Sequence, residues 1–172
     1  LINNQKASQI IEHIVYNKLD ATYDSSVFTS ATLRGKLGLN AMEASHSLYT
    51  HVIYDSKNEK KFAEELDISE NVAVYVKLPG SFFISTPVGK YNPDWAIAFH
   101  EGAVQHIYFV AETKGNLDSM ELRGIEKAKI ECAKAHFAAI SNESVLYQVV
   151  DNYSTLMQIV TNTLPPAQNA KG

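Results

Sequence analysis

Two carboxylates and an ammonium group stand at the ends of two apolar stretches in PDWAIAFHEGAVQHIYFVAETKG, residues 93–115. Asp94 opens the first stretch, and Glu112 and Lys114 close the second. A buried carboxylate is costly unless it is paired or bound to a metal ion. Carboxylate oxygens are ligands that Mg²⁺ prefers, and a bound divalent ion activates water and stabilises charge on a phosphoryl oxygen. These residue types indicate metal-assisted hydrolysis of a phosphodiester.

The three side chains can act together only if the two stretches form neighbouring strands. In a strand, residues two apart share a face, so Glu112 and Lys114 point the same way. If 94–99 and 104–113 form an antiparallel hairpin, the register that brings Asp94 directly opposite Glu112 needs only a connection of ordinary hairpin length. We therefore expect Asp94 and Glu112 to hold Mg²⁺ or Mn²⁺. Lys114 would orient the attacking water or neutralise charge on the phosphate.

The rest of the chain predicts the elements that position these strands. Apolar residues at helical spacing predict helices at 4–19, 56–66, 118–140 and 154–162. Further strands are predicted at 71–79, 81–85 and 144–150, with a turn at TPVGKYNP in which Gly89 takes a positive φ. Residues 20–40 indicate a loop with a short helical turn, and 41–54 are ambiguous. The order predicts an α/β fold with a central mixed β-sheet flanked by helices.

Length and charge narrow the class of protein. The 172 residues are enough for one domain with a sizeable core, and no apolar run approaches the ~20 residues that span a bilayer. The net charge is −4 and there is no basic run, so a DNA-acting chain of this kind would have its DNA held by something else. The single cysteine, Cys132, excludes an internal disulfide and fits a reducing, cytoplasmic location. Because the chain starts at Leu1 without a leader pattern, we expect a fragment or processed form.

The residues around the acids resemble a known family. NPDWA followed by ETKG is similar to the PD-(D/E)xK nuclease motif. The surrounding text is more specific: VYVKLP, FISTPVGKYNPDWAI, IYFVAETKG and LRGIEKAKIECAKAHF resemble the C-terminal endonuclease domain of the restriction (Res) subunit of type III restriction-modification enzymes. The resemblance covers roughly residues 54–150. It implies a restriction-endonuclease-like fold, with catalysis by Asp94, Glu112 and Lys114.

The resemblance also implies partners. These are double-stranded DNA, a modification (methyltransferase) subunit that reads the sequence, and a second nuclease domain to cut the second strand. It implies an ATP-dependent, helicase-like motor upstream, and the chain itself has no G-x-x-x-x-G-K-[ST] phosphate loop that would use ATP. On this basis, 1–40 would be a linker to that motor, 41–163 the endonuclease domain and 164–172 a disordered tail.

Two helix residues extend the candidate site. Glu59 either completes a capping box with Ser56, bonding back to the Ser56 amide, or supplies the acid that many nucleases of this class contribute from their first helix. Lys129 falls near the centre of the apolar stripe of the long helix, where a lysine must find an anion or extend to water. It would contact phosphate or water in the site, or else form a buried pair with Glu126.

Other chemistries fit the sequence less well. His100 and His106 would face each other at the far end of the hairpin, too distant from Asp94 to share its metal, and we expect them to be exposed. Cys132 and Trp95 are expected in the core, and Asn116 could contact the DNA backbone. Two alternatives remain open: a non-catalytic docking module for the modification subunit, and a repair or resolvase-type nuclease of the same fold.

Overall fold

The computed structural model describes residues 35–87, 89–100, 107–112, 124–140 and 145–162, with the backbone alone at 107–112, 124–126, 140 and 145. The helix predicted at 4–19, the start of the one predicted at 118–140 and the predicted tail lie outside these residues. So do Lys114, Asn116 and His106.

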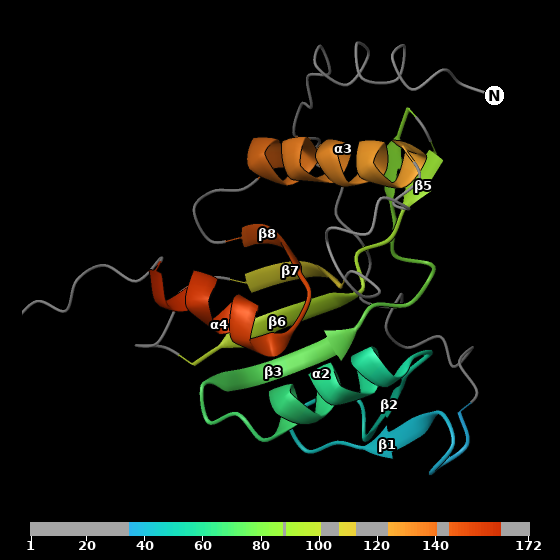
Figure 1. Cartoon of the computed structure of the whole chain (residues 1–172), viewed down its shortest axis with the longest axis vertical. Helices are drawn as coiled ribbons and strands as arrows, with labels where there is room; N and C mark the ends of the chain where they lie inside the picture. The colour runs from blue at the N-terminus through green and yellow to red at the C-terminus, as the bar shows by residue number, and fades with distance from the viewer. Residues whose placement is uncertain (1–34, 88, 101–106, 113–123, 141–144, 163–172) are drawn as a thin grey trace, which may run out of the picture.

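A four-stranded mixed sheet forms the centre of the domain (Figure 1). Its strands are β3 (Val72–Lys77), β6 (Trp95–Phe99), β7 (Ile107–Glu112) and β8 (Val145–Val150), in the order β3-β6-β7-β8. β6 runs antiparallel to both β3 and β7, whereas β8 runs parallel to β7. A parallel pair needs a crossover, and α3 (Gly124–Ile140) lies between these two strands in the chain. The predicted mixed α/β sheet is confirmed.

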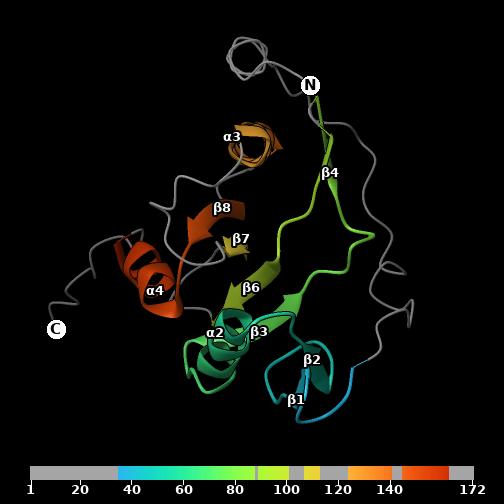
Figure 2. The ribbon, with the colours of Figure 1, turned by 45° about the vertical axis from the view of Figure 1, so that its right-hand side comes forward.

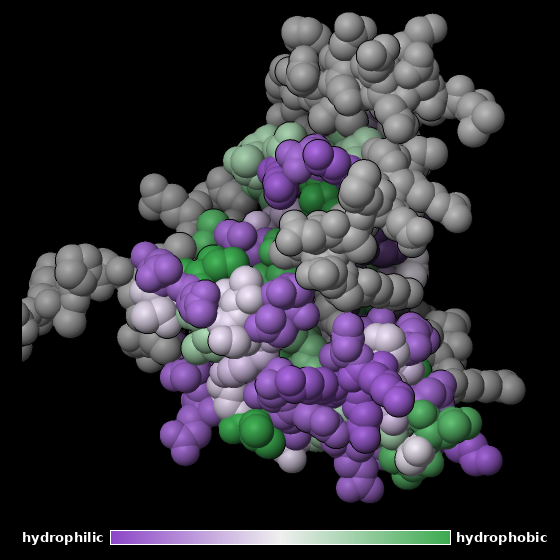
Figure 3. Space-filling view, viewed as in Figure 1, coloured by the Kyte–Doolittle hydropathy of each residue, from purple (hydrophilic) through white to green (hydrophobic). Residues whose placement is uncertain are grey.

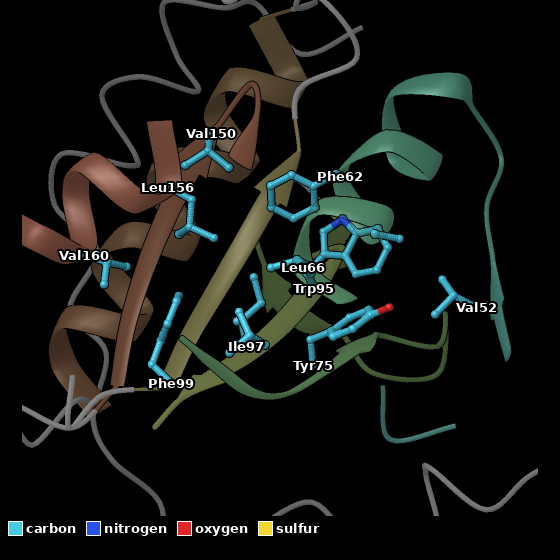
Figure 4. Packing of buried hydrophobic residues seen from close by; sticks show 12 residues of the cluster. Val52, Phe62, Leu66, Tyr75, Trp95, Ile97, Phe99, Val150, Leu156 and Val160 are labelled. Carbon is cyan, nitrogen blue, oxygen red and sulfur yellow. The ribbon is translucent and has the colours of Figure 1, made fainter. Parts of the chain in front are cut away.

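Helices α2 (Lys57–Asp67) and α4 (Tyr153–Asn162) cover one face of this sheet (Figure 4). Trp95 is fully buried there, with its ring centroid 5.6 Å from that of Phe62 and 6.2 Å from that of Tyr75. The core on this face consists of Val52, Phe62, Ala63, Leu66, Val72, Tyr75, Trp95, Ile97, Phe99, Val150, Leu156 and Val160. Trp95 is therefore a core residue, as predicted.

The sequence of α2 explains both its start and its orientation. Ser56 is the N-cap, and its side chain accepts a hydrogen bond of 3.1 Å from the amide of Glu59, as the predicted capping motif requires. Glu59, Phe62, Ala63 and Leu66 are buried on one side, whereas the other side is hydrophilic and exposed (Figure 3). An amphipathic helix of this kind buries its apolar stripe on the sheet.

The opposite face carries α3 and a separate hairpin of β4 (Ile84–Thr86) and β5 (Gly89–Tyr91), which extends away from the main sheet (Figure 2). Ile84 and Tyr91 of the hairpin pack with Ala133 and Phe137 of α3. The strand predicted at 81–85 starts later than expected, and residues 89–91 of the turn predicted at 86–93 form strand β5. The apolar residues before Ile84 are instead drawn into a turn in which the Phe82 amide bonds to the Pro79 carbonyl at 2.9 Å. Gly89 has φ of 116°, so its predicted positive φ is confirmed.

The ambiguous segment 41–54 forms a short hairpin of β1 (Ala41–Glu43) and β2 (His51–Ile53). The segment between its strands lies along the outer edge of β3, where Leu48 donates to the Tyr75 carbonyl at 2.8 Å and Tyr75 donates to the His46 carbonyl at 3.1 Å. This pairing covers part of an edge that would otherwise present unpaired backbone groups. No helix among the described residues is long and apolar enough to cross a membrane.

Candidate active site

Asp94 lies on a bend immediately before β6. Pro93 and Trp95 on either side are buried, and Asp94 itself is half-buried. The Asp94 carbonyl accepts a 2.8 Å hydrogen bond from the amide of Leu78, the residue that follows β3. Its backbone is therefore tied to the sheet before regular strand geometry begins. Glu112 is the last residue of β7. Because β6 and β7 are antiparallel, the two acidic residues stand at the same end of adjacent strands.

The register between these strands differs by one residue from the one we expected. Trp95 pairs with Val110 and Ile97 with Tyr108, so Asp94 falls opposite Ala111 rather than Glu112. The register is set by burying Trp95, Ile97 and Phe99 on one face. The sequence of β7 is apolar at both alternations, and so it could not distinguish the two registers.

A one-residue difference reverses the face of a strand position. Glu112 pairs with Val150, whose side chain is in the core beneath α2 and α4, so its position belongs to that face. Strand alternation would send Asp94 to the α3 face. Asp94 lies on a bend just before the strand, and the side chain of Glu112 and the whole of Lys114 are outside the described residues. The convergence of Asp94, Glu112 and Lys114 stays a prediction.

The charge of Asp94 acts on Tyr147 of β8, which lies on the α3 face of the sheet. Burial raises the pKa of the Tyr147 phenol; its hydrogen bond with Tyr91 opposes this change, and the charges of Asp94 and Glu131 reinforce it. The Tyr147 ring stacks on Phe137 of α3, with centroids 5.3 Å apart and planes 5° from parallel. Asp94 therefore lies within electrostatic range of an aromatic cluster that joins β5, β8 and α3.

Glu59 is buried at the start of α2, with 4% of its surface exposed. Its Oε2 accepts a hydrogen bond of 2.7 Å from the amide of Asp55, one residue before the Ser56 amide of the expected capping box. The same oxygen lies 2.5 Å from Nζ of Lys77. The capping role of Glu59 is thus present in altered form, whereas its role as an acid of the site stays a prediction.

Lys77 is a partner of Glu59 that the sequence analysis did not anticipate. It is the last residue of β3, its side chain is 18% exposed, and Nζ contacts both Glu59 and, at 2.8 Å, Oδ2 of Asp55. Burial favours the neutral amine, but the hydrogen bonds and charges of the two carboxylates outweigh it, so the pKa of Lys77 is raised. The available signal was the spacing of Lys77 from Tyr75, which puts both on one face of a strand.

Lys129 lies on the half-buried side of α3, beside the buried residues Ala128, Cys132 and Ala133. Its position on the core-facing stripe is as predicted. It approaches the β4–β5 hairpin, because a Cβ built on Gly89 would lie 3.8 Å from its Cε. Lys129 thus lies on the α3 side of the sheet, as does the aromatic cluster near Asp94. The side chain of Glu126 is outside the described residues, so the alternative pairing with Lys129 is untested.

The remaining histidines and acids define no further centre among the described side chains. Among these side chains, no group of three or more His, Cys, Asp or Glu residues is placed to hold a metal ion. The side chain of Glu112 is not among the described ones. His100 is exposed and Cys132 is buried in the core, both as expected.

Comparison with known proteins identifies the family to which the chain belongs. Residues 45–153 match the family model described as "Endonuclease domain", and the chain belongs to this endonuclease-domain family. The match confirms the resemblance drawn from the residues around Asp94 and Glu112, and it fits the mixed α/β fold of a restriction-endonuclease-like domain.

Two relatives are Res subunits of type III restriction-modification enzymes. The EcoPI subunit of Escherichia phage P1 is 34% identical over 124 residues, covering 69% of this chain and 12% of that protein. The EcoP15I subunit of Escherichia coli is 31% identical over 167 residues, covering 87% of this chain and 17% of that protein. The chain thus spans less than a fifth of either relative. No solved structure matches it.

Proposed function

We propose that this chain is the DNA-cleaving module of a type III restriction enzyme and hydrolyses phosphodiester bonds with Mg²⁺ or Mn²⁺. The observation that carries the proposal is the placing of Asp94 and Glu112 at the same end of paired strands β6 and β7, in a member of an endonuclease family. Carboxylate oxygens are the donors that these ions take. Given the register, the bend at Asp94 must direct its carboxylate to the end of the sheet.

A bound Mg²⁺ would supply a nucleophilic water and stabilise charge on the phosphoryl group. Asp94 and Glu112 would hold it. Lys114, two residues beyond Glu112, would donate a hydrogen bond to the attacking water or to the phosphate oxygen. Glu59 would add a carboxylate from α2, and Lys129 a cation from α3 that contacts phosphate.

The partners follow from the relatives, which are Res subunits of restriction-modification enzymes. The substrate is double-stranded DNA, delivered by a modification subunit and by an ATP-driven motor in the remainder of the polypeptide, in the cytoplasm. The net charge of −4 agrees with a module to which DNA is brought. Because one site cuts one strand, a second copy of the domain completes a double-strand break.

Metal titration of the 172-residue chain tests the site without requiring DNA delivery. Isothermal titration with Mn²⁺ should detect binding that Asp94→Ala and Glu112→Ala remove, and that Glu70→Ala, which removes an exposed carboxylate before β3, leaves unchanged. In the full-length enzyme assembled with its modification subunit, Lys114→Ala should abolish cleavage, while in the chain it should retain Mn²⁺ binding. Cleavage that persists in Lys114→Ala would exclude its assigned role.

One observation favours the alternative of a non-catalytic docking module: the register that sets Asp94 opposite Ala111. A module of that kind would bind no Mn²⁺ through Asp94 or Glu112, and neither substitution would affect DNA cleavage by the assembled enzyme. Loss of cleavage in both variants, together with loss of metal binding, excludes docking as the sole function.

A further inference from the structure

The half-buried ion pair between Lys77 and Glu59 lies at the same end of the sheet as the proposed metal ligands. Lys77 pairs with Trp95, the residue after Asp94, and so sits level with the start of β6. Trp95 in turn pairs with Val110, two residues before Glu112. Two strand spacings separate Lys77 from β7, a distance of about 10 Å.

Glu59, Lys77 and the Glu112 position share one face of the sheet. Phe62, one turn after Glu59, packs on Trp95, which brings the buried stripe of α2 over β6. Glu112 pairs with Val150, which lies in the same core as Trp95. The Glu59 carboxylate and the Glu112 position therefore belong to the same face of the sheet.

The contacts of Glu59 fix its orientation. The amide of Asp55 and the ammonium of Lys77 both reach Oε2, at 2.7 Å and 2.5 Å. Asp55 also binds Lys77 from outside, at 2.8 Å, and its side chain is 70% exposed. The ammonium and the amide both bind one oxygen of Glu59, and this fixes the orientation of the carboxylate. Breaking these contacts is costly, because it leaves a buried charge without a partner.

We infer that Lys77 is a positioning residue, which holds the Glu59 carboxylate at the end of the sheet so that Glu59 supports the divalent ion of Asp94 and Glu112. The inference rests on the proposed function and assigns Lys77 no contact with substrate. Lys77 acts through Glu59 alone. Removing either residue therefore has the same effect on metal binding, and removing both adds nothing.

Mn²⁺ affinity of the 172-residue chain, measured by isothermal titration, tests this coupling. Lys77→Met and Glu59→Gln should each weaken Mn²⁺ binding about tenfold, and the double variant should match Glu59→Gln within about threefold, since coupled residues are not additive. Lys77→Arg keeps the charge and should stay within about threefold of the wild type. Lys60→Met is the matched control. It removes a lysine of helix α2 that pairs with Glu64 at 3.4 Å and has a side chain 44% exposed.

Two results would overturn the inference. One is unchanged Mn²⁺ affinity in Lys77→Met with a lowered thermal midpoint, which defines a purely structural ion pair. The other is a double variant markedly weaker than Glu59→Gln. If Lys77→Met fails to fold, Lys77→Gln retains a hydrogen-bond donor without the charge and carries the same expectation. Failure of the proposed function gives a different result, because the Asp94→Ala variant would then bind Mn²⁺ as tightly as the wild-type chain.

Discussion

The hydroxyl groups of Tyr91 and Tyr147 lie 2.5 Å apart, in a buried hydrogen bond that joins hairpin strand β5 to sheet strand β8. Their rings meet edge to face with centroids 6.2 Å apart. Tyr91 precedes Asp94 by three residues, so this contact anchors the segment that leads into the site. The arrangement connects the stability of the hairpin with the position of a proposed metal ligand.

Tyr147→Phe should therefore lower the free energy of unfolding by about 1–2 kcal/mol, because it removes the hydrogen-bond partner of a buried hydroxyl. Tyr91→Phe should cost a similar amount. The double variant should be less destabilised than the two singles together, since it removes both hydroxyls at once. Urea denaturation of the four proteins gives the coupling directly, and additive losses would show that the two hydroxyls do not interact.

Stability should fall as the pH rises above about 10. Burial, with the charge and hydrogen bond of Asp67, raises the pKa of Tyr75, and burial raises that of Tyr147. The unfolded chain therefore loses these protons first, so their contribution is complete below the unfolded pKa and is lost at higher pH, by about 1.4 kcal/mol per pH unit for each group. Lys77, whose pKa is also raised, acts in the same direction.

Denaturation series at pH 8, 10 and 11 measure this loss, and Tyr75→Phe should flatten the curve. The hydroxyl of Tyr75 donates to Oδ1 of Asp67 at 3.2 Å, so the variant also loses some stability at pH 8. A curve with the same slope in the variant and the wild type would contradict the assignment of Tyr75.

Ser56→Ala should destabilise the chain by about 1 kcal/mol, the usual effect of deleting an N-cap side chain. The hydroxyl of Ser56 accepts from the Glu59 amide at 3.1 Å, which satisfies a donor at the start of α2. Exposed Ser154 in the first turn of α4 offers a control, and Ser154→Ala should change the unfolding free energy by less than about 0.5 kcal/mol. Equal effects of the two substitutions would argue against capping.

Gly89→Ala should cost about 1–3 kcal/mol for a reason of backbone conformation alone. Its φ is 116°, which side chains rarely adopt, while an added Cβ would meet only Lys129 Cε at an ordinary 3.8 Å. Gly80→Ala is the matched control, since Gly80 has no positive φ and an added Cβ meets nothing within 4 Å. Thermal unfolding of both variants separates backbone strain from steric contact, and equal midpoints would exclude strain at Gly89.

Local patterns predicted the elements well where one signal dominated. Ser56 and Glu59 defined the start of α2, and the apolar run before Lys77 defined β3. The register of β6 on β7 was mispredicted because both strands are apolar on both faces, and their pairing is decided by which residues pack beneath α2.

Lys77 was missed for a related reason. A lysine at the end of a strand is usually solvated, and nothing local in the sequence shows that Glu59 and Asp55, on a preceding helix and its entry, will surround it. The residue types at Asp94 and Glu112 predicted metal-assisted hydrolysis, which stays a prediction, whereas their location at one end of the sheet depends on strand pairing.

Asp94 and Glu112 stand at one end of the paired strands β6 and β7, and the connection between these strands starts from the opposite end. β6 leaves the sheet at Phe99 and β7 enters it at Ile107, so about five residues of strand, or roughly 16 Å, separate that connection from the two acids. Fluorophores, affinity tags or crosslinkers inserted between Phe99 and Ile107 would be joined to the sheet at the end remote from the two proposed metal ligands. A label at this place could therefore report on the domain without occupying the proposed metal site.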